Sequence, residues 1–134
     1  MSGLARAMDA NANRAREALR VMEDAARFAL DDAALAGEAK GVRHALQGAL
    51  RALPEGWLEA NRDTPGDVGR ELQGEHETHR VGHHAVVVAA GKRLGEALRS
   101  LEECLKTCAP EAARQVEALR YRGYALEGAL ALRM

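Results

Sequence analysis

The chain has 134 residues, enough for one small domain with a buried core. Aromatic residues make up 3 % of it, and alanine, leucine, arginine and glutamate dominate, a composition typical of helices. The formal net charge of −1 gives no general attraction to nucleic acid or anionic membranes, and no apolar run approaches the roughly 18 residues of a spanning helix. We therefore expect a soluble cytoplasmic protein, with neither nucleic acid nor a membrane as partner.

The first predicted helix begins near Met8, where Asp9 places negative charge at the N-terminal end, as a cap or in the first turn. Its apolar residues step by four and three, as one buried face requires: Met8, Ala12, Ala15, Leu19, Met22, Ala26 and Ala29. Asp31 and Asp32 start a second helix. Its apolar stripe runs from Leu35 to Leu53, and it ends at Pro54 and Gly56.

A connection of about 25 residues follows, from about 54 to about 79, with no clear periodicity. The Trp57-Leu58 pair predicts that its start is anchored in the core. Further on, Asp63 and Asp67 flank a Thr-Pro-Gly turn. The two carboxylates could coordinate a metal ion or accept a proton, or this could be a capped surface turn. Both interpretations remain open.

The third predicted helix carries the apolar residues Leu94, Leu98, Leu101, Leu105 and Cys108 on one face. Four histidines precede or open it (His76, His79, His83 and His84), and we expect them to be solvated rather than metal-bound. Cys104 and Cys108 are predicted to be reduced core thiols, because a disulfide within one helical turn has poor geometry. Pro110 starts a fourth helix, with Val116, Leu119, Ala125 and Leu130 among its apolar positions.

The first and third helices repeat one charged pattern 79 residues apart, since the run 14–24 reappears as 93–103. The predicted fold is therefore an all-α bundle in one domain, residues 1–134. It consists of two pseudo-repeated α-hairpins, about 8–53 and 87–132, joined by a long crossover loop, about 54–79.

Each copy of the repeat carries a polar stripe: Asn13, Glu17, Arg20, Asp24 and Arg27 in the first, and Lys92, Glu96, Arg99, Glu103 and Lys106 in the second. Exposed ion pairs on a solvated face would explain such stripes. The repeated charge order instead favours two rows that face each other, with arginines for phosphates and carboxylates for Mg²⁺. Arg14 and Arg93 lie nearer the apolar edge and could point outward or into a central cavity.

Three separated motifs carry a family resemblance. The first is the run 9–24, which continues through Arg27-Phe28, and the second is the run 62–69. The third is Lys92-Arg93 with the run 96–103, and Leu119-Arg120-Tyr121 and Tyr124 follow it. Together they resemble the small hydroxymethylpyrimidine phosphate kinase (phosphomethylpyrimidine kinase) family of thiamine biosynthesis. That family occurs alone or fused in front of thiamine-phosphate synthase. Its members often carry asparagine where this chain has Gly91.

The resemblance implies ATP- and Mg²⁺-dependent phosphorylation of 4-amino-5-hydroxymethyl-2-methylpyrimidine phosphate to the diphosphate, with thiamine-phosphate synthase as the pathway partner. On this basis Arg14, Arg20, Arg93 and Arg99 grip the phosphates, and Asp63 and Asp67, with Glu17 or Glu96, hold Mg²⁺ or order the loop. Asp9 or Asn13 would read the aminopyrimidine edge. The remaining candidate substrate contacts are Arg27, Thr64 and Lys92.

Two other functions remain as alternatives. An all-α Mg²⁺-dependent nucleotide pyrophosphohydrolase also uses paired acids on helices, but it leaves the repeated arginines unexplained. A non-enzymatic helical interaction module, with homodimerisation as one form, would use the charged stripes only as solvated faces. Three points stay open at this stage: the assignment of ATP and pyrimidine to the two rows, the oligomeric state of the kinase, for which an alanine-rich bundle allows a homodimer, and the choice between a stand-alone kinase and an excised domain.

Overall fold

The computed structural model describes residues 2–72 and 78–134, and it is helical throughout its regular parts. Within these residues the chain forms no strand, so the predicted all-α class is confirmed. The elements are α1 (Ser2–Asp24), a π-helical turn η1 (Ala25–Ala29), α2 (Ala33–Leu50), α3 (Trp57–Ala60), α4 (Gly82–Leu105) and α5 (Pro110–Arg133).

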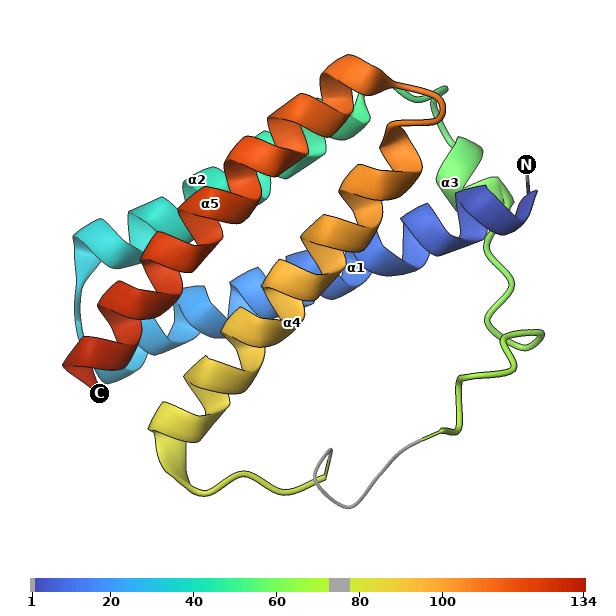
Figure 1. Cartoon of the computed structure of the whole chain (residues 1–134). Helices are drawn as coiled ribbons and strands as arrows, with labels where there is room; N and C mark the ends of the chain where they lie inside the picture. Colours follow the sequence, from blue (N-terminus) through green and yellow to red (C-terminus); the bar gives the residue numbers. More distant parts are fainter. Residues whose placement is uncertain (1, 73–77) are drawn as a thin grey trace.

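The two long hairpins, α1 with α2 and α4 with α5, pack against each other (Figure 1). The most extensive contact joins α1 to α4, and these helices cross in roughly opposite directions, while α2 lies alongside α5. The repeated sequence is therefore a repeated structure, in which the first helices of the two copies pack on each other. None of the described helices is long and apolar enough to cross a membrane.

The core consists of the predicted apolar stripes, with three exceptions. Met8 to Ala26 on α1, Val42 and Leu46 on α2, and the leucines of α4 are buried. Ala29 is exposed, because the chain changes to a π-helical turn after Asp24 and the helical face no longer continues. Cys108 is exposed because α4 ends at Leu105, and Ala125 also lies on the solvent side. The prediction of core positions was wrong for these three residues.

Helix boundaries follow local chemistry except at the start of α1. Asp32 caps α2, since its Oδ1 accepts a hydrogen bond of 3.0 Å from the backbone N–H of Leu35. Pro110 occupies the first turn of α5, as predicted. The first helix, however, begins at Ser2 rather than near Met8, because Ala5 extends the buried face toward the N-terminus. Asp9 therefore lies inside α1 and does not cap it.

The crossover connection contains one short helix, α3. Leu58 in this helix is buried, and Trp57 packs against the core, so the predicted anchor is confirmed. Helix α2 ends at Leu50, before the predicted end at Pro54, and the chain turns while Leu53 remains buried. The anchored start directs the following loop back along α1.

Candidate functional site: a cavity between the first helix and the crossover loop

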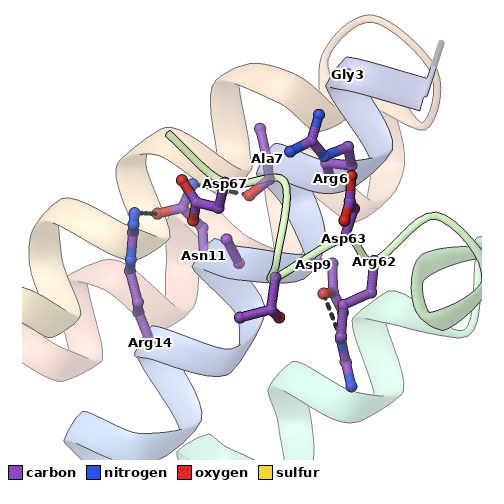
Figure 2. Close-up of a pocket in the computed structure, with 11 residues that line it drawn as sticks. Gly3, Arg6, Ala7, Asp9, Asn11, Arg14, Arg62, Asp63 and Asp67 are labelled. Atoms are coloured by element: carbon purple, nitrogen blue, oxygen red, sulfur yellow. Dashed lines mark hydrogen bonds and ion pairs between the residues drawn. The ribbon is translucent and has the colours of Figure 1, made fainter. Parts of the chain in front are cut away.

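A cavity of about 320 Å³ lies between the N-terminal half of α1 and the crossover loop (Figure 2). The helix contributes residues three or four apart, which share one face, and the loop contributes the segment after α3. The lining consists of Gly3, Arg6, Ala7, Asp9, Ala10, Asn11, Arg14, Arg62, Asp63, Thr64 and Asp67. The sequence prediction had included five of these residues: Asp9, Arg14, Asp63, Thr64 and Asp67.

Asp9 and Arg62 fix the loop to the helix. The Arg62 guanidinium donates two hydrogen bonds to the carboxylate, from Nε to Oδ2 at 2.7 Å and from Nη2 to Oδ1 at 2.6 Å (Figure 2). The hydrogen bond and the charge of Asp9 raise the pKa of Arg62. Because Asp9 is only 4 % exposed, its charge requires this partner. Both carboxylate oxygens are thereby occupied, and the pair acts first as a clamp.

The predicted aspartate turn forms at the mouth of the cavity. Asp63 accepts a hydrogen bond of 3.0 Å from the backbone N–H of Gly66, and Asp67 accepts one of 2.8 Å from Gly69. Each aspartate uses Oδ1 for these bonds, so Oδ2 of each carboxylate takes no part in them. Both side chains are exposed. The turn is therefore a capped surface turn whose carboxylates also border the cavity.

Asn11 connects the cavity wall to α4. Its Nδ2 donates to the backbone oxygen of Ala7 at 2.9 Å and to the hydroxyl of Ser100 at 3.1 Å. Its Oδ1 accepts a hydrogen bond of 3.3 Å from Arg14 Nη1, which orients that arginine along the helix (Figure 2). Sequence reasoning missed Asn11 and Ser100. The usable signal for Asn11 was its position one turn before Arg14.

Charged side chains of both copies extend along α1 and α4 from the Asn11–Ser100 hydrogen bond beside this cavity. On α4, Glu96 and Arg93 precede Ser100 by four and seven residues, so they share its face of the helix. On α1, Glu17 follows Arg14 by three residues. These four charged side chains are exposed, and none of them forms an ion pair within residues 2–72 and 78–134. Arg14 and Arg93 thus point outward and remain available to an anionic ligand.

The other predicted site residues do not join the cavity. Arg20 lies 3.7 Å from Glu23, and Lys92 lies 3.2 Å from Glu127. Arg27 packs on the ring of Phe28 at 4.8 Å, about 20 Å along the helix from the cavity. Two further residues interact with neighbours on their own helix. Arg99 lies 3.7 Å from Glu102, and Oδ1 of Asn13 accepts a hydrogen bond of 2.6 Å from Arg16. The polar stripe of each copy is therefore not one continuous site.

Part of the repeated charge order is structural. Glu23 and Glu102 occupy equivalent places in the repeat, and both are buried. Glu23 accepts a hydrogen bond of 3.0 Å from Arg43, and Glu102 accepts one of 3.1 Å from Arg120. The hydrogen bond with the Tyr124 hydroxyl and that with Glu102 raise the pKa of Arg120. A buried carboxylate needs such partners, which gives the acids of the repeat a reason independent of any ligand.

Within the described residues, no three histidine, cysteine, aspartate or glutamate side chains gather closely enough to hold a metal ion. Asp63, Asp67 and Glu96 therefore do not form the predicted cluster. Mg²⁺ in phosphoryl-transfer sites takes only one or two carboxylates and fills its shell with phosphates and water. Asp63 and Asp67 fit that mode. His79, His83 and His84 are exposed, as predicted, and His76 lies outside the described residues.

Gly91 is the position at which the resemblance departs from the family pattern. It is buried, and an added Cβ there would lie 2.4 Å from Cγ of Glu127. Glu127, held by Lys92, fills the space into which an asparagine would project. A side chain at residue 91 would therefore have to displace the side chain of Glu127.

Comparison with known proteins gives a consistent result. Residues 6–129 match the ThiD2 family. The chain is 45 % identical over 129 residues to the thiamine-phosphate synthase of Rhodopirellula baltica, covering 96 % of this chain and 34 % of that protein. It is 44 % identical to the thiamine-phosphate synthase of a Synechocystis strain, covering 96 % and 36 %, and 45 % identical to that of Nostoc punctiforme, covering 93 % and 34 %.

The chain spans about a third of the length of these curated relatives. No solved structure matches it significantly. The match to the family nevertheless includes α1 from residue 6 onward, the crossover loop and α4, which together carry most of the cavity and the charges beside it. The chain therefore belongs to the ThiD2 family, a family of thiamine biosynthesis.

Proposed function

We propose that the chain is an ATP-dependent kinase that converts 4-amino-5-hydroxymethyl-2-methylpyrimidine phosphate to its diphosphate. The observation that supports this most directly is the cavity itself. It is lined by two arginines, the exposed Arg14 and the half-buried Arg6, and by the two carboxylates of the aspartate turn. Guanidinium groups bind phosphate oxygens, and Mg²⁺-binding carboxylates recruit a nucleotide, so both requirements of phosphoryl transfer lie in one place.

In this reaction an oxygen of the acceptor phosphate forms a bond to the γ-phosphorus of ATP, and the bond from that phosphorus to the β–γ bridging oxygen breaks, releasing ADP. The acceptor oxygen is largely ionised near neutral pH, so a strong general base is not required. The protein's contribution is positioning and charge neutralisation. We assign the acceptor phosphate to Arg14, with Arg93 across the α1–α4 crossing as a second cation.

Asp63 and Asp67 would hold Mg²⁺ together with the nucleotide phosphates. The ion, when bound, neutralises the negative charge that develops during transfer. The Asp9–Arg62 clamp keeps the loop that carries these carboxylates against α1. Arg62 itself therefore positions the site rather than binding a phosphate.

A requirement for a phosphorylated substrate follows from the charges. The monophosphate supplies an anion that can pair with the guanidinium of Arg14, whereas a neutral alcohol gains no such ion pair. The relatives are named for thiamine-phosphate synthase, and we infer that the diphosphate made here is passed to such an enzyme in the cytoplasm.

The test is ADP release with ATP and Mg²⁺, with the pyrimidine monophosphate compared to the unphosphorylated alcohol. Turnover with the monophosphate alone is the expected result. Arg14→Ala and Asp63→Asn should each lower kcat/KM by about 100-fold or more, the usual cost of losing a group that stabilises transition-state charge. The matched controls are Arg114→Ala and Glu111→Gln, an exposed pair on α5, and these should leave turnover unchanged.

Turnover with neither compound would refute the proposed kinase. Hydrolysis of ATP without an acceptor would instead support the pyrophosphohydrolase. Normal kcat/KM in Arg14→Ala or Asp63→Asn would remove that residue from the site.

A further inference from the structure

The two tyrosines of the chain lie together on an exposed face of α5. Only four aromatic residues occur in the whole sequence, one tryptophan, one phenylalanine and two tyrosines. Tyr121 and Tyr124 are 56 % and 45 % exposed, and their rings meet edge to face with centroids 6.2 Å apart. Since aromatic side chains contribute most when they are buried, their placement here calls for a reason other than the core.

These tyrosines are held in place by buried groups. The guanidinium carbon of Arg120 lies 4.9 Å from the ring centroid of Tyr121 and 5.9 Å from that of Tyr124. Arg120 is itself 7 % exposed and is fixed by Glu102. We call the exposed surface made by Tyr121 and Tyr124, with the buried Arg120 beneath it, the aromatic shelf.

The absence of a side chain at Gly95 brings the shelf onto α4. A Cβ at this buried glycine would lie only 2.9 Å from the ring carbon Cε1 of Tyr124, so the ring rests almost directly on the α4 backbone. A flat ligand stacking on the shelf would therefore meet rings that are already ordered. Such preorganisation lowers the entropic cost of binding.

Cationic side chains on α4 lie beside the shelf. Lys92 and Arg99 precede and follow Gly95 by about one turn, and both are exposed. Each also has an acidic neighbour, Glu127 at 3.2 Å from Lys92 and Glu102 at 3.7 Å from Arg99, so a bound phosphate would compete with these carboxylates. Arg99 is followed directly by Ser100, whose hydroxyl bonds to Asn11 in the cavity wall. Helix α4 thus lies between α5, which carries the shelf, and α1, which lines the cavity, so the axes of α5 and α1 are at most about two interhelical spacings apart, roughly 16–20 Å.

The size of the cavity indicates what the shelf could bind. At about 320 Å³ the cavity is at the lower end of the volumes of single-ligand pockets. It can enclose a pyrimidine phosphate or the terminal phosphates of a nucleotide, but not both substrates entirely. A kinase with this cavity needs a second surface nearby for the base of its nucleotide.

We infer that the aromatic shelf stacks the purine base of the nucleotide, whose phosphates cross α4 beside Arg99 toward the cavity. This inference rests on the proposed kinase function and adds the location of the base. Stacking suits a purine because its π-face is large and needs no specific hydrogen bonds. Arg99 is then a phosphate contact at the crossing point.

The experiment measures binding of ADP with Mg²⁺ by calorimetry, beside binding of inorganic pyrophosphate, which has no base. Tyr124→Leu should weaken ADP binding roughly 5- to 150-fold, the range for losing one base–aromatic stack, while pyrophosphate binding stays unchanged. Tyr124→Phe retains the ring and should bind ADP within about twofold of the unaltered protein. Tyr121→Leu, at the more exposed position, should act in the same direction with less risk to folding.

Unchanged ADP binding in both leucine variants would overturn the inference. So would a parallel loss of ADP and pyrophosphate binding, because that would show a distorted helix pair rather than a lost stacking surface. The kinase assay separates the two proposals. If both leucine variants are active kinases with an unchanged KM for ATP, only the inference about the aromatic shelf is refuted. If ADP binding depends on the tyrosines but no phosphoryl group is transferred, only the proposed kinase function is refuted.

Discussion

Replacement of Arg120 by methionine should destabilise the protein strongly, because it leaves a buried carboxylate without its main partner. Glu102 is fully buried. Its Oε1 accepts the hydrogen bond of 3.1 Å from Arg120, while Oε2 accepts no hydrogen bond and lies 3.7 Å from both Arg99 and Lys106. Methionine keeps most of the apolar stem of arginine, so the change isolates the charge and its hydrogen bonds.

Removal of one member of a buried ion pair costs about 3–5 kcal/mol. Two cations remain near Glu102, each half-exposed, so we expect the lower end, about 3 kcal/mol. Such a loss is large against the roughly 5–15 kcal/mol that stabilises a domain. Urea unfolding followed by circular dichroism measures it as a lower midpoint with little change in slope.

The control is Arg114→Met on the same helix. Arg114 pairs with Glu111 at 2.7 Å, but both side chains are more than 70 % exposed, so the expected loss is below about 0.5 kcal/mol. Adding Glu102→Gln to Arg120→Met should recover part of the stability, because the uncompensated charge disappears. The reasoning is refuted if Arg120→Met costs no more than Arg114→Met, or if the added glutamine lowers stability further.

Three further predictions concern single sites. Gly128→Ala should raise the free energy of unfolding by about 1 kcal/mol, since nothing lies within 4 Å of the added methyl group. Gly123→Ala should gain less or lose stability, because its methyl group would lie 2.9 Å from a core leucine. Equal midpoints of the two variants in urea would contradict this. Asp32 accepts a hydrogen bond from the backbone N–H of Leu35 and lies beside Arg133, and both lower the pKa of its carboxyl below 3.8 in the folded state. The ionised carboxyl therefore stabilises the fold fully above pH 3.8. This stabilisation is lost as the pH falls through the lower pKa of the folded protein. The stability advantage of the unaltered protein over Asp32→Asn should therefore shrink on acid titration. A constant difference between about pH 6 and about pH 2, the range in which aspartates titrate, would exclude this. Cys108 is exposed while burial raises the pKa of the Cys104 thiol, so a maleimide should label Cys108 first by mass spectrometry, and equal rates would disagree with the structure.

Several features could be predicted from the sequence because they depend on neighbours along the chain. Helical periodicity places Leu19 and Leu98 in the core, and local capping chemistry sets the starts of α2 at Asp32 and of α5 at Pro110. The repeat indicated two equivalent hairpins. Turn-forming residues likewise predicted the aspartate turn, because its hydrogen bond joins Asp63 to the backbone N–H of Gly66, only three residues away.

The positions of the buried charges depended on tertiary structure. Asp9 resembles a helix cap by its sequence position, yet it is buried and paired with Arg62, which lies 53 residues away. Glu23 and Glu102 belong to polar runs, but helix packing removes both from water. Helical spacing shows which residues share a face, but not whether another element covers that face. For this protein the sequence therefore determined the helices and the list of charged candidates. The packing of α1 against α4 and of the crossover loop against α1 decided which charges are buried partners and which remain available to a ligand.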